Sequence, residues 1–369
     1  MEKFKITLKW LPLIFVGFLF TSLAYGEPLK KRIFVVSSYH KSYLWSQSTH
    51  KGLTEAMLNY GYLDKTEQIK SFTKNDAIES SKAIIQKDWM DTKRKNSPQE
   101  IAQATTRIMQ TIHAFKPDLV LLGDDNAANY IGNQLLDTNV PVVFWGINGL
   151  PLKYGLIESM DSPGHNITGV WQAGYHKESV EFLKALVPEI KTFAILACDS
   201  VTTRPKVKQV QVLAKKGKLP LKLVDTVMTN SFSEYKTKVL ALTQKVDAFF
   251  MLNHDTLRDD QGAYVDMLTV GKWYLENVKK PEASHAYQFI REGMLSAAND
   301  SGYNQGYKAF EMAYDILDQG LNPSHMRTIA PPRGTLMVNR KRAEMLGISL
   351  EDKMDIIEEI VEEAIALER

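Results

Sequence analysis

The sequence contains a single cysteine, Cys198, in a chain of 369 residues. An intramolecular disulfide is therefore excluded, and a chain of this length can be held together by its hydrophobic core alone. Cys198 follows the apolar run FAILA. We therefore expect it to be a small buried hydrophobic residue rather than a nucleophile.

The sequence also has no large excess of basic over acidic residues, or of acidic over basic residues. The formal net charge is +2, and the first 26 residues hold three lysines and one glutamate, so the remainder carries equal numbers of basic and acidic residues. It has no basic block of the kind that binds phosphates, and phosphate neutralisation supplies most of the affinity of proteins for nucleic acid. Nucleic acid is therefore not expected as a partner.

Signatures of catalysis and of metal binding are absent. The eight histidines are scattered singly without HExxH spacing, so no metal site is expected. His254 and Asp255 in LNHDTLRDD form a possible dyad, but no serine in a GxSxG elbow accompanies them. We predict no catalytic residue and no cofactor, and we expect a protein that is not an enzyme.

Long apolar runs are missing outside the N-terminus. There, three lysines precede an apolar run from Trp10 to about Ala24, and small residues follow. This arrangement is typical of a secretory signal peptide, and we place its cleavage after Gly26. The run is shorter than the ~20 residues of a membrane-spanning helix, which argues against an uncleaved anchor. No cysteine follows it, so a lipid anchor at this site is excluded.

Beyond the signal peptide, short apolar runs alternate with amphipathic stretches of helical length. The runs predict strands at residues 32–38, 67–73, 117–123, 140–146, 191–197, 221–227, 246–253 and 283–289. The main intervening stretches predict helices at residues 46–60, 98–115, 175–190, 203–218, 231–245 and 259–276. This alternation is typical of parallel sheets covered on both faces. It breaks at residues 148–169, which are rich in Gly, Pro and Asn. We therefore expect an α/β protein with two doubly wound lobes rather than one barrel.

Ligands of open parallel sheets bind beyond the carboxyl ends of the strands. Five predicted loops lie at such ends, after residues 36, 123, 144, 198 and 252. The candidate ligand-binding residues in and near these loops are Ser37, Ser38, Tyr39, Tyr43, Trp45, Asp124, Asp125, Asn126, Trp145, Asn148, Asp199, Ser200, Arg204, Asn253, Asp255 and Tyr287.

Several of these residues have an alternative structural role. Ser37 and Ser38 precede a predicted helix start and could meet an anion, or they could only cap local backbone. Asp124 and Asp125 could hold a metal or a phosphoryl group, although no Gly-rich phosphate loop or partner lysine accompanies them. They could equally cap the following helix or pair with a ligand ammonium.

The aromatic residues are the stronger indication of a ligand. Those on loops or strand ends are Tyr39, Tyr43, Trp45, Trp145, Trp171, Tyr175 and Tyr287. Some of these rings are expected to pack between the lobes. Their concentration at one edge favours a pocket for a ligand with a flat or apolar face. We expect Tyr43 or Trp45 to contact the ligand, and Ser38 to donate to it. Asp125 or Asp199 would accept from an ammonium group if the ligand is an amino acid.

An ordered set of segments carries a family resemblance. The segments are VVSSYHKSYLWSQSTHKGL, PDLVLLGDDNAANYI, VPVVFWGIN, HNITGVWQ, MLSAANDSGYNQGYKAFEMAYDIL and GTLMVNRKRAEMLGISL. Together they resemble the substrate-binding components of ABC transporters with the type I periplasmic-binding-protein fold. Within that family they look most like the branch of tryptophan- and tyrosine-type binders.

The resemblance implies two lobes joined by three crossings with a hinge, and a small-molecule ligand enclosed between the lobes. The crossings would lie at residues 145–169, near 287–293 and near 321–332. The first lobe would comprise residues 28–148 plus 289–325, and the second 149–288 plus 326–369. It also implies a periplasmic protein that serves an ABC permease. Because this domain also occurs in sensors, the alternative is a sensory partner of a membrane histidine kinase or chemoreceptor.

Overall fold

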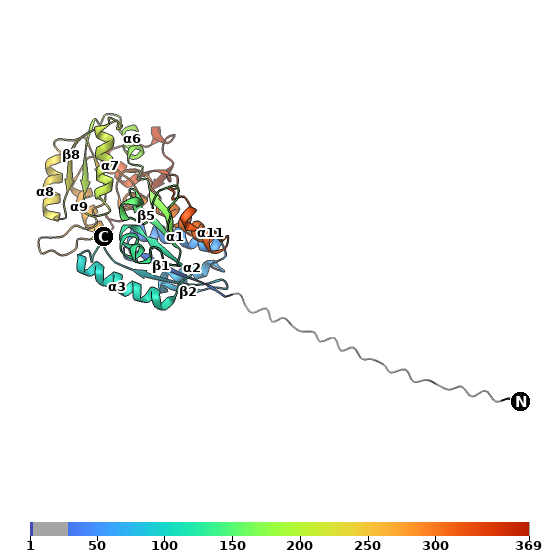
Figure 1. Ribbon diagram of the computed structural model, residues 1–369. Helices are drawn as coiled ribbons and strands as arrows, with labels where there is room; N and C mark the ends of the chain where they lie inside the picture. The colour runs from blue at the N-terminus through green and yellow to red at the C-terminus, as the bar shows by residue number, and fades with distance from the viewer. Residues whose placement is uncertain (3–28, 369) are drawn as a thin grey trace.

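The computed structural model describes residues 1–2 and 29–368 and forms two α/β lobes (Figure 1). The predicted signal peptide, residues 1–26, lies outside the described residues apart from its first two. In the described part, no helix combines the length and the apolar character needed to cross a membrane.

The first lobe is built on a six-stranded sheet with the order β2-β3-β1-β4-β5-β6. All neighbouring strands are parallel except the β2–β3 pair at the edge. The strands are β1 (Lys31–Ser37), β2 (Ala77–Glu79), β3 (Ala83–Trp89), β4 (Leu119–Gly123), β5 (Val142–Asn148) and β6 (Ile167–Gln172).

Helices cover both faces of this sheet. Along β1, Ile33 and Val35 point toward α1, α2 and α11, whereas Phe34 and Val36 point toward α3 and η1. Because successive strand residues face opposite sides, a strand covered on both faces must be apolar at every position. The helical segments are α1 (Leu44–Asn59), α2 (Thr66–Asn75), α3 (Pro98–Phe115), α4 (Asp124–Asn126), η1 (Ala127–Gly132), α5 (Asn133–Leu135), η2 (Pro151–Tyr154), α11 (Gly302–Leu317) and η3 (Pro323–His325).

The second lobe contains a seven-stranded sheet with the order β13-β12-β11-β10-β9-β7-β8, in which only the β11–β12 pair is antiparallel. Its strands are β7 (Thr192–Ala197), β8 (Lys222–Met228), β9 (Ala248–Met251), β10 (Glu282–Ser284), β11 (Ser296–Ala298), β12 (Leu336–Asn339) and β13 (Glu359–Val361).

Two layers of helices enclose the second sheet. One face packs against α8, α9 and α10, and the other against α6, α7 and α12. The helical segments of this lobe are α6 (His176–Leu186), α7 (Arg204–Lys215), α8 (Phe232–Leu242), α9 (Met267–Asn277), α10 (Tyr287–Glu292), α12 (Arg340–Leu346) and η4 (Glu351–Lys353). The predicted α/β fold with two sheet-based lobes is confirmed.

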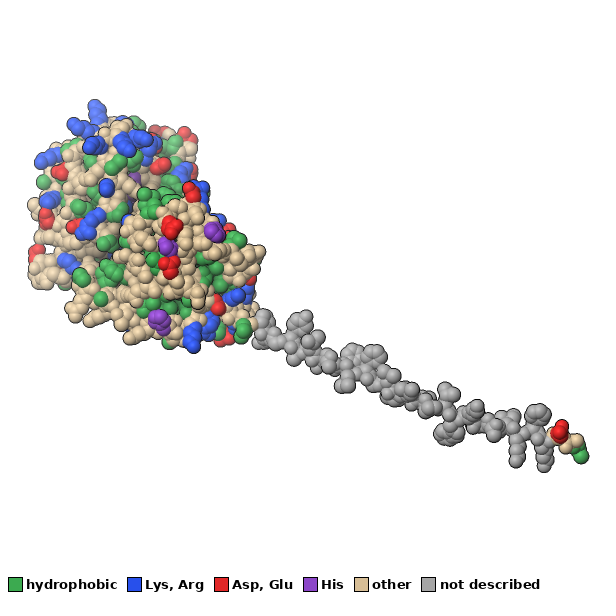
Figure 2. Space-filling view, viewed as in Figure 1, with side chains coloured by type: hydrophobic (Ala, Val, Ile, Leu, Met, Phe, Trp, Pro, Cys, Tyr) green, Lys and Arg blue, Asp and Glu red, His purple; other side chains and the backbone are tan. Residues whose placement is uncertain are grey.

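Lysine and arginine side chains gather over the end of the second lobe that carries α6 and α7 (Figure 2). The C-terminal part of α7 and the residues after it contribute the exposed Lys215, Lys216 and Lys218. This basic area lies at the end of α7 remote from the first lobe, because the N-terminal turn of the helix is the part that faces that lobe. It is therefore a solvated surface separate from the region where the lobes meet.

Two glycines bring α1 and α11 into close contact. A Cβ atom on Gly52 would lie 2.0 Å from the carbonyl oxygen of Tyr303, and one on Gly306 would lie 2.0 Å from the carbonyl oxygen of Thr49. Side chains at these positions would push the helices apart. The close contact fixes α1, and with it the loop before α1, against the helix that follows one of the crossings between the lobes.

The chain crosses between the lobes at residues 173–175, 299–301 and 330–335. The crossings are bonded to one another. Gly174 N donates to Asp300 Oδ2 at 3.0 Å, Asn299 N donates to Thr335 O at 3.1 Å, and the Tyr175 hydroxyl donates to Pro331 O at 2.6 Å. The three crossings therefore form one connected unit.

The observed sheets correct the predicted lobe boundaries of 28–148 plus 289–325 and 149–288 plus 326–369. Strand β6 pairs with β5 in the first sheet, and β11 pairs with β10 and β12 in the second. The Gly- and Pro-rich stretch at 148–169 is a loop that packs Leu156 and Ile157 onto the first lobe and returns to its sheet. It is therefore not a crossing. The prediction was wrong because a Gly- and Pro-rich composition indicates a break in the pattern but does not show to which lobe the chain continues. We propose lobes of residues 29–172 plus 302–329 and 176–298 plus 336–368.

Two predicted strands differ from the structure. Residues 67–73 lie in α2, where Ile69, Phe72 and Thr73 share one helix face, and the strand that pairs with β1 on this side of the sheet is β3. The predicted strand at 283–289 ends at Ser284, and α10 begins at Tyr287. Residues 287–293, predicted to be a crossing, therefore belong to the second lobe.

A buried ion pair in the second lobe gives a first prediction. The Arg342 guanidinium donates to Glu282 at 3.0 and 2.9 Å, and both side chains are fully buried. We expect Arg342→Met to lower the free energy of unfolding by ~3–5 kcal/mol, because it leaves Glu282 charged and uncompensated. Urea denaturation measures this loss.

The neighbouring Arg340→Met is the matched control, since Arg340 pairs with Glu362 at the surface and exposed pairs contribute at most ~1 kcal/mol. The double variant Arg342→Met/Glu282→Gln should regain part of the loss. Equal effects of the two single variants would contradict this role for Arg342.

Candidate ligand-binding site

The carboxyl ends of strands from both sheets face each other where the lobes meet. The first lobe contributes the loop after β1, the segment after β3, and the ends of β4 and β5. The second lobe contributes the loops after β7, β9 and β10. This is the edge at which parallel sheets bind ligands.

Asp255, in the loop after β9, is the centre of the contacts between the lobes. Its carboxylate accepts from Lys93 Nζ at 2.9 Å, from the Tyr43 hydroxyl and from Asn253 Nδ2 at 2.9 Å. Lys93 and Tyr43 belong to the first lobe. Burial alone would raise the pKa of Asp255, but the Lys93 ammonium and the two hydrogen bonds hold it well below its usual range. A buried ion pair thus joins the two lobes.

The aromatic loop, which we define as residues 37–45, packs into this interface. The rings of Tyr39 and Tyr43 meet edge to face with centroids 5.1 Å apart, and Lys93 Nζ lies 4.4 Å from the Tyr39 ring centroid. Trp45 donates its indole N–H to Asp124 Oδ1 at 2.7 Å. Tyr39, Tyr43 and Trp45 are all buried, and they belong to the same apolar cluster as the core of the second lobe. The rings therefore contact both lobes at once.

A small cavity lies between the lobes beside these rings. The space that it encloses is ≈ 10 Å³, about enough for one water molecule, so a larger ligand could enter only if the lobes separated. The residues that line it are Tyr39, Tyr43, Trp45, Asn148, Gln172, Thr202, Lys206, Asn253, His285, Ala286 and Gln288.

A buried cation faces this cavity from the second lobe. Lys206, in the first turn of α7, donates to His285 Nε2 at 2.7 Å and to Asn253 Oδ1 at 3.0 Å. Burial lowers the pKa of Lys206 to about 8, and the Asp300 carboxylate opposes that shift. Burial and the nearby Lys206 lower the pKa of His285. His285 is therefore neutral, and its Nε2 can accept from the ammonium group.

Acceptors without partners also border the cavity. Within residues 29–368, the side-chain oxygens of Asn148 and Gln288 are buried and receive no hydrogen bond. They come from opposite lobes. Buried polar atoms are rarely left unpaired in folded proteins. Two orphan acceptors, one buried ammonium and three aromatic rings suit a small zwitterion with a flat apolar side.

The structure brings many of the predicted residues to the interface. Tyr39, Tyr43, Trp45, Asn148 and Asn253 line the cavity, and Asp255 is bonded to its wall. A wider opening beside the cavity is lined by both lobes, and the predicted residues there are Asn126, Asp199, Ser200 and Arg204. Whether any of them binds a ligand stays a prediction.

Other predicted residues have structural partners instead. The Ser38 hydroxyl donates to Gly123 O at 2.6 Å and accepts from Ala127 N at 2.8 Å, so it joins two loops of the first lobe. Asp125 accepts from Asn148, Lys153 and Tyr154 within the same lobe. These bonds leave neither group directed at a ligand.

Four further predicted residues also lie away from the cavity lining. Trp145 is buried in the core of the first lobe, with its ring against Gly123, because it shares with Val143 the face of β5 that packs against α1 and α11. Ser37 is buried at the end of β1. Tyr287 lines a separate groove beside α10. Asp124 is buried behind Trp45, to which it is bonded.

Sequence reasoning missed six polar residues at or beside the cavity. They are Lys93, Gln172, Thr202, Lys206, His285 and Gln288. Lys93 lies in the charged segment DWMDTKRKNSP, whose composition is typical of a solvated loop. Only the register of β3, which ends at Trp89, brings this segment to the ligand-facing edge. Lys206 follows Pro205 at a helix start, a position that could have indicated a ligand-facing cation.

Residues 73–359 match the family model described as ABC transporter substrate binding protein. The chain belongs to this family. It is a family of substrate-binding proteins rather than of enzymes. The predicted resemblance is confirmed.

Named relatives add detail to this assignment. The chain is 24% identical over 215 residues to a tyrosine-binding protein of Clostridioides difficile (strain R20291), and the match spans 58% of this chain and 59% of that protein. Among solved structures, the chain resembles "the ABC domain in complex with L-Trp from Streptococcus pneumonia", with a TM-score of 0.68, 22% identity, and coverage of 90% of this chain and 100% of the other.

A second solved structure is the ligand-free, open form of a substrate-binding protein with adhesive properties from Clostridium difficile. The TM-score is 0.63 and the identity 20%, and the alignment covers 90% of this chain and 99% of the other. At these identities both structures establish the fold and leave the ligand undetermined.

The buried Asp124 predicts a pH-dependent stability. Burial, and the neighbouring Asp125 to a smaller extent, raise the pKa of Asp124 to about 8, although the Trp45 hydrogen bond opposes this shift. The unfolded chain releases this proton near pH 4, so stability is lost as the pH rises from ~4 to ~8, and the loss is complete above ~8.

Asp124→Asn cannot release a proton, so it should remove this part of the pH dependence. Because one pKa unit corresponds to ~1.4 kcal/mol, we expect the parent to lose several kcal/mol more than the variant between pH 5 and 8. Urea denaturation at both pH values measures the difference. Asp260→Asn, an exposed control, should behave as the parent. Parallel pH profiles of the parent and Asp124→Asn would contradict the assignment.

Proposed function

We propose that this protein captures an amino acid with an aromatic or flat apolar side chain between its lobes and presents it to an ABC importer. The single observation that carries the proposal is the cavity between the lobes. It combines a buried ammonium group, two orphan amide oxygens and a wall of aromatic rings. The named ligands of the relatives, tyrosine and L-Trp, belong to the same chemical class.

The carboxylate of the ligand would bind Lys206. Among the described residues, this ammonium group bonds to two neutral acceptors, His285 and Asn253. A carboxylate is a stronger partner for a buried ammonium than a neutral acceptor is, because both groups then form charge-assisted hydrogen bonds. Binding would also return the pKa of Lys206 toward its usual value.

The ammonium group of the ligand would bind the side-chain oxygens of Asn148 and Gln288. Because these acceptors come from opposite lobes, a ligand held by both would hold the lobes together. The Asp255 carboxylate lies in the same interface and adds negative potential. Tyr39, Tyr43 and Trp45 would contact the apolar side of the ligand, as predicted from the sequence of the aromatic loop.

Entry and release of the ligand would require the lobes to separate. The interlobe cavity is lined by Tyr43 and Trp45 from the first lobe and by Lys206, His285 and Gln288 from the second. The three bonded crossings at 173–175, 299–301 and 330–335 are the proposed hinge, since hinges are usually a few residues at the ends of elements.

Export to the periplasm by a cleaved signal peptide and delivery to a permease are parts of the same proposal. Membership of the family supports both. The alternative of a sensory partner for a membrane kinase or chemoreceptor has no support in the named relatives.

Calorimetric titration with L-tryptophan and L-tyrosine tests the proposal. We expect saturable binding of at least one of them to the parent protein. Lys206→Met should weaken that binding by roughly 10- to 100-fold, because hydrogen bonds to charged groups contribute ~1.5–3 kcal/mol.

The matched control is Lys208→Met, an exposed residue of the same helix, which should bind as the parent does. Thermal unfolding of each variant checks that it is folded. Absence of binding by both amino acids, or equal affinity of the parent and Lys206→Met, would contradict the proposed site.

A further inference from the structure

A second pocket lies within the first lobe, behind the aromatic loop. It has a volume of ≈ 220 Å³ and is bordered by α1, α2, the end of β3 and the loop after β1. Its lining is Lys41, Ser46, Gln47, His50, Lys51, Thr54, Ile69, Thr73 and Trp89. No residue of this lining also lines the cavity between the lobes.

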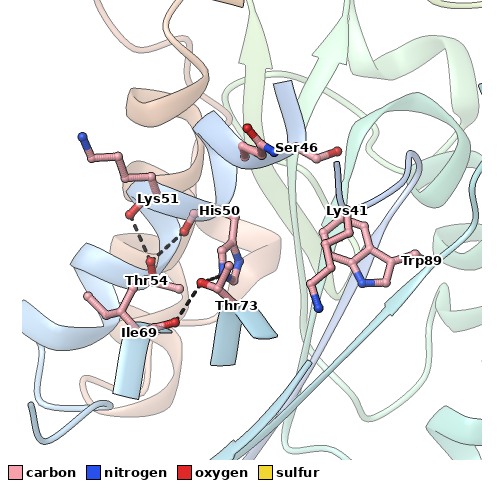
Figure 3. Close-up of a pocket in the computed structure, with 9 residues that line it drawn as sticks. Lys41, Ser46, His50, Lys51, Thr54, Ile69, Thr73 and Trp89 are labelled. Carbon is pink, nitrogen blue, oxygen red and sulfur yellow. Dashed lines mark hydrogen bonds between the residues drawn. The ribbon is translucent and has the colours of Figure 1, made fainter. Parts of the chain in front are cut away.

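Figure 3 shows the arrangement of these side chains. His50 and Thr73 lie on one side, joined by a hydrogen bond of 2.9 Å, and Lys41 and Trp89 lie on the other. Ile69, the methyl groups of the threonines and the Trp89 ring give the pocket apolar walls. A ligand here would need an apolar body.

A buried lysine that is not itself part of the lining contacts two residues of the lining, His50 and Trp89. Lys87 is 4% exposed, and its Nζ is 3.3 Å from His50 Nδ1 and 3.9 Å from the Trp89 ring centroid. Burial lowers the pKa of Lys87 to about 7, although Asp76 opposes this shift. Among the described residues, no carboxylate lies within ion-pair distance of this ammonium group.

The only hydrogen-bonding partner of Lys87 in the described chain, His50, is a neutral acceptor. Burial and the charge of Lys87 lower the pKa of His50 far below neutrality, so its Nδ1 can accept from Lys87. The Trp89 ring offers its negative face to the same ammonium group. A lysine ammonium group has three N–H donors, so one that contacts a single acceptor and a ring can still donate a further hydrogen bond.

Two donors that belong to the lining itself have no hydrogen-bond partner in residues 29–368. They are the Ser46 hydroxyl, on a residue that is 2% exposed, and the indole N–H of Trp89. Asp76 Oδ1 is also unpaired, but its other oxygen accepts from Lys41 at 2.9 Å, which ties that carboxylate to the mouth of the pocket. Lys51 adds a second cation at the mouth. The excess of donors and cations favours an anion.

We propose that this pocket binds a small carboxylic acid with a compact, flat apolar body, its carboxylate directed toward Lys87, Ser46 and Trp89. The body would lie between Ile69 and the Trp89 ring. Such a site is separate from the interlobe site, although Ser46 adjoins Trp45 in the chain. A ligand held there would contact the segment that carries the aromatic loop.

The test uses 4-fluorobenzoate as the probe and ¹⁹F NMR line widths and shifts as the readout. We expect saturable binding to the full chain without its signal peptide. Lys87→Met should weaken binding by at least about tenfold, because it removes the charge-assisted bond. Ile69→Trp fills the pocket and should abolish binding. Acetate, which lacks the ring, should compete at least about tenfold more weakly than benzoate.

Two controls separate this site from other surfaces. Lys70→Met changes an exposed lysine of α2 and should leave binding unchanged. Lys206→Met alters the interlobe cavity and should also leave it unchanged, so failure of one site is distinguishable from failure of the other. Lack of saturation at about 10 mM probe, or equal binding by the parent, Lys87→Met and Ile69→Trp, would overturn the proposal. Melting curves confirm that the variants are folded.

Discussion

The ionised carboxylate of Asp255 is the constraint on which the interface between the lobes depends. A fully buried charge is costly unless it is paired and hydrogen-bonded, and this one finds Lys93 and Tyr43 in the other lobe. The Asp255 carboxylate therefore connects the loop after β9 to two segments of the first lobe that are far away in the sequence. The same contact places the aromatic loop against the core of the second lobe, so that rings from one lobe complete an apolar cluster of the other. The cavity for the proposed ligand lies beside these bonds.

Two further sets of contacts, one between α1 and α11 and one between the crossings, fix the parts of the chain that border the cavity. Gly52 and Gly306 let α1 and α11 approach closely, which positions the aromatic loop at the start of α1. Helix α11 follows the crossing that contains Asp300, whose carboxylate binds Gly174 of another crossing and whose backbone N–H binds His285 O at 2.8 Å. His285 in turn accepts from Lys206 at the cavity. The crossings are thus linked to the site by a short chain of hydrogen bonds, which gives a proposed route by which ligand binding would alter the hinge.

Much of the fold could be predicted from the sequence, because the central strands are apolar at every position. The runs that became β1, β4, β5, β7, β8 and β9 were located correctly. Strand β3 was not. Strand β3 carries Gln86, Lys87 and Asp88, so it lacked that signal, and α2 was mistaken for a strand. The aromatic loop was predicted to be at the ligand-facing edge and lies there. The role of Lys93 could not be predicted, because it depends on a partner 162 residues away, and long-range pairing leaves no local pattern. Trp145 was misplaced because it lies within β5, on the face that packs against α1 and α11, and not in the loop after the strand.

Small-angle X-ray scattering of Asp255→Ala tests the central claim most directly. If the carboxylate of Asp255 joins the lobes through Lys93 and Tyr43, its removal leaves a buried ammonium without a counter-charge, and the lobes should separate. We predict a larger radius of gyration for Asp255→Ala than for the parent, with unchanged secondary structure by circular dichroism. Asp260→Ala, an exposed residue of the same loop region, should scatter as the parent does. Identical scattering curves for the parent and Asp255→Ala would contradict the account.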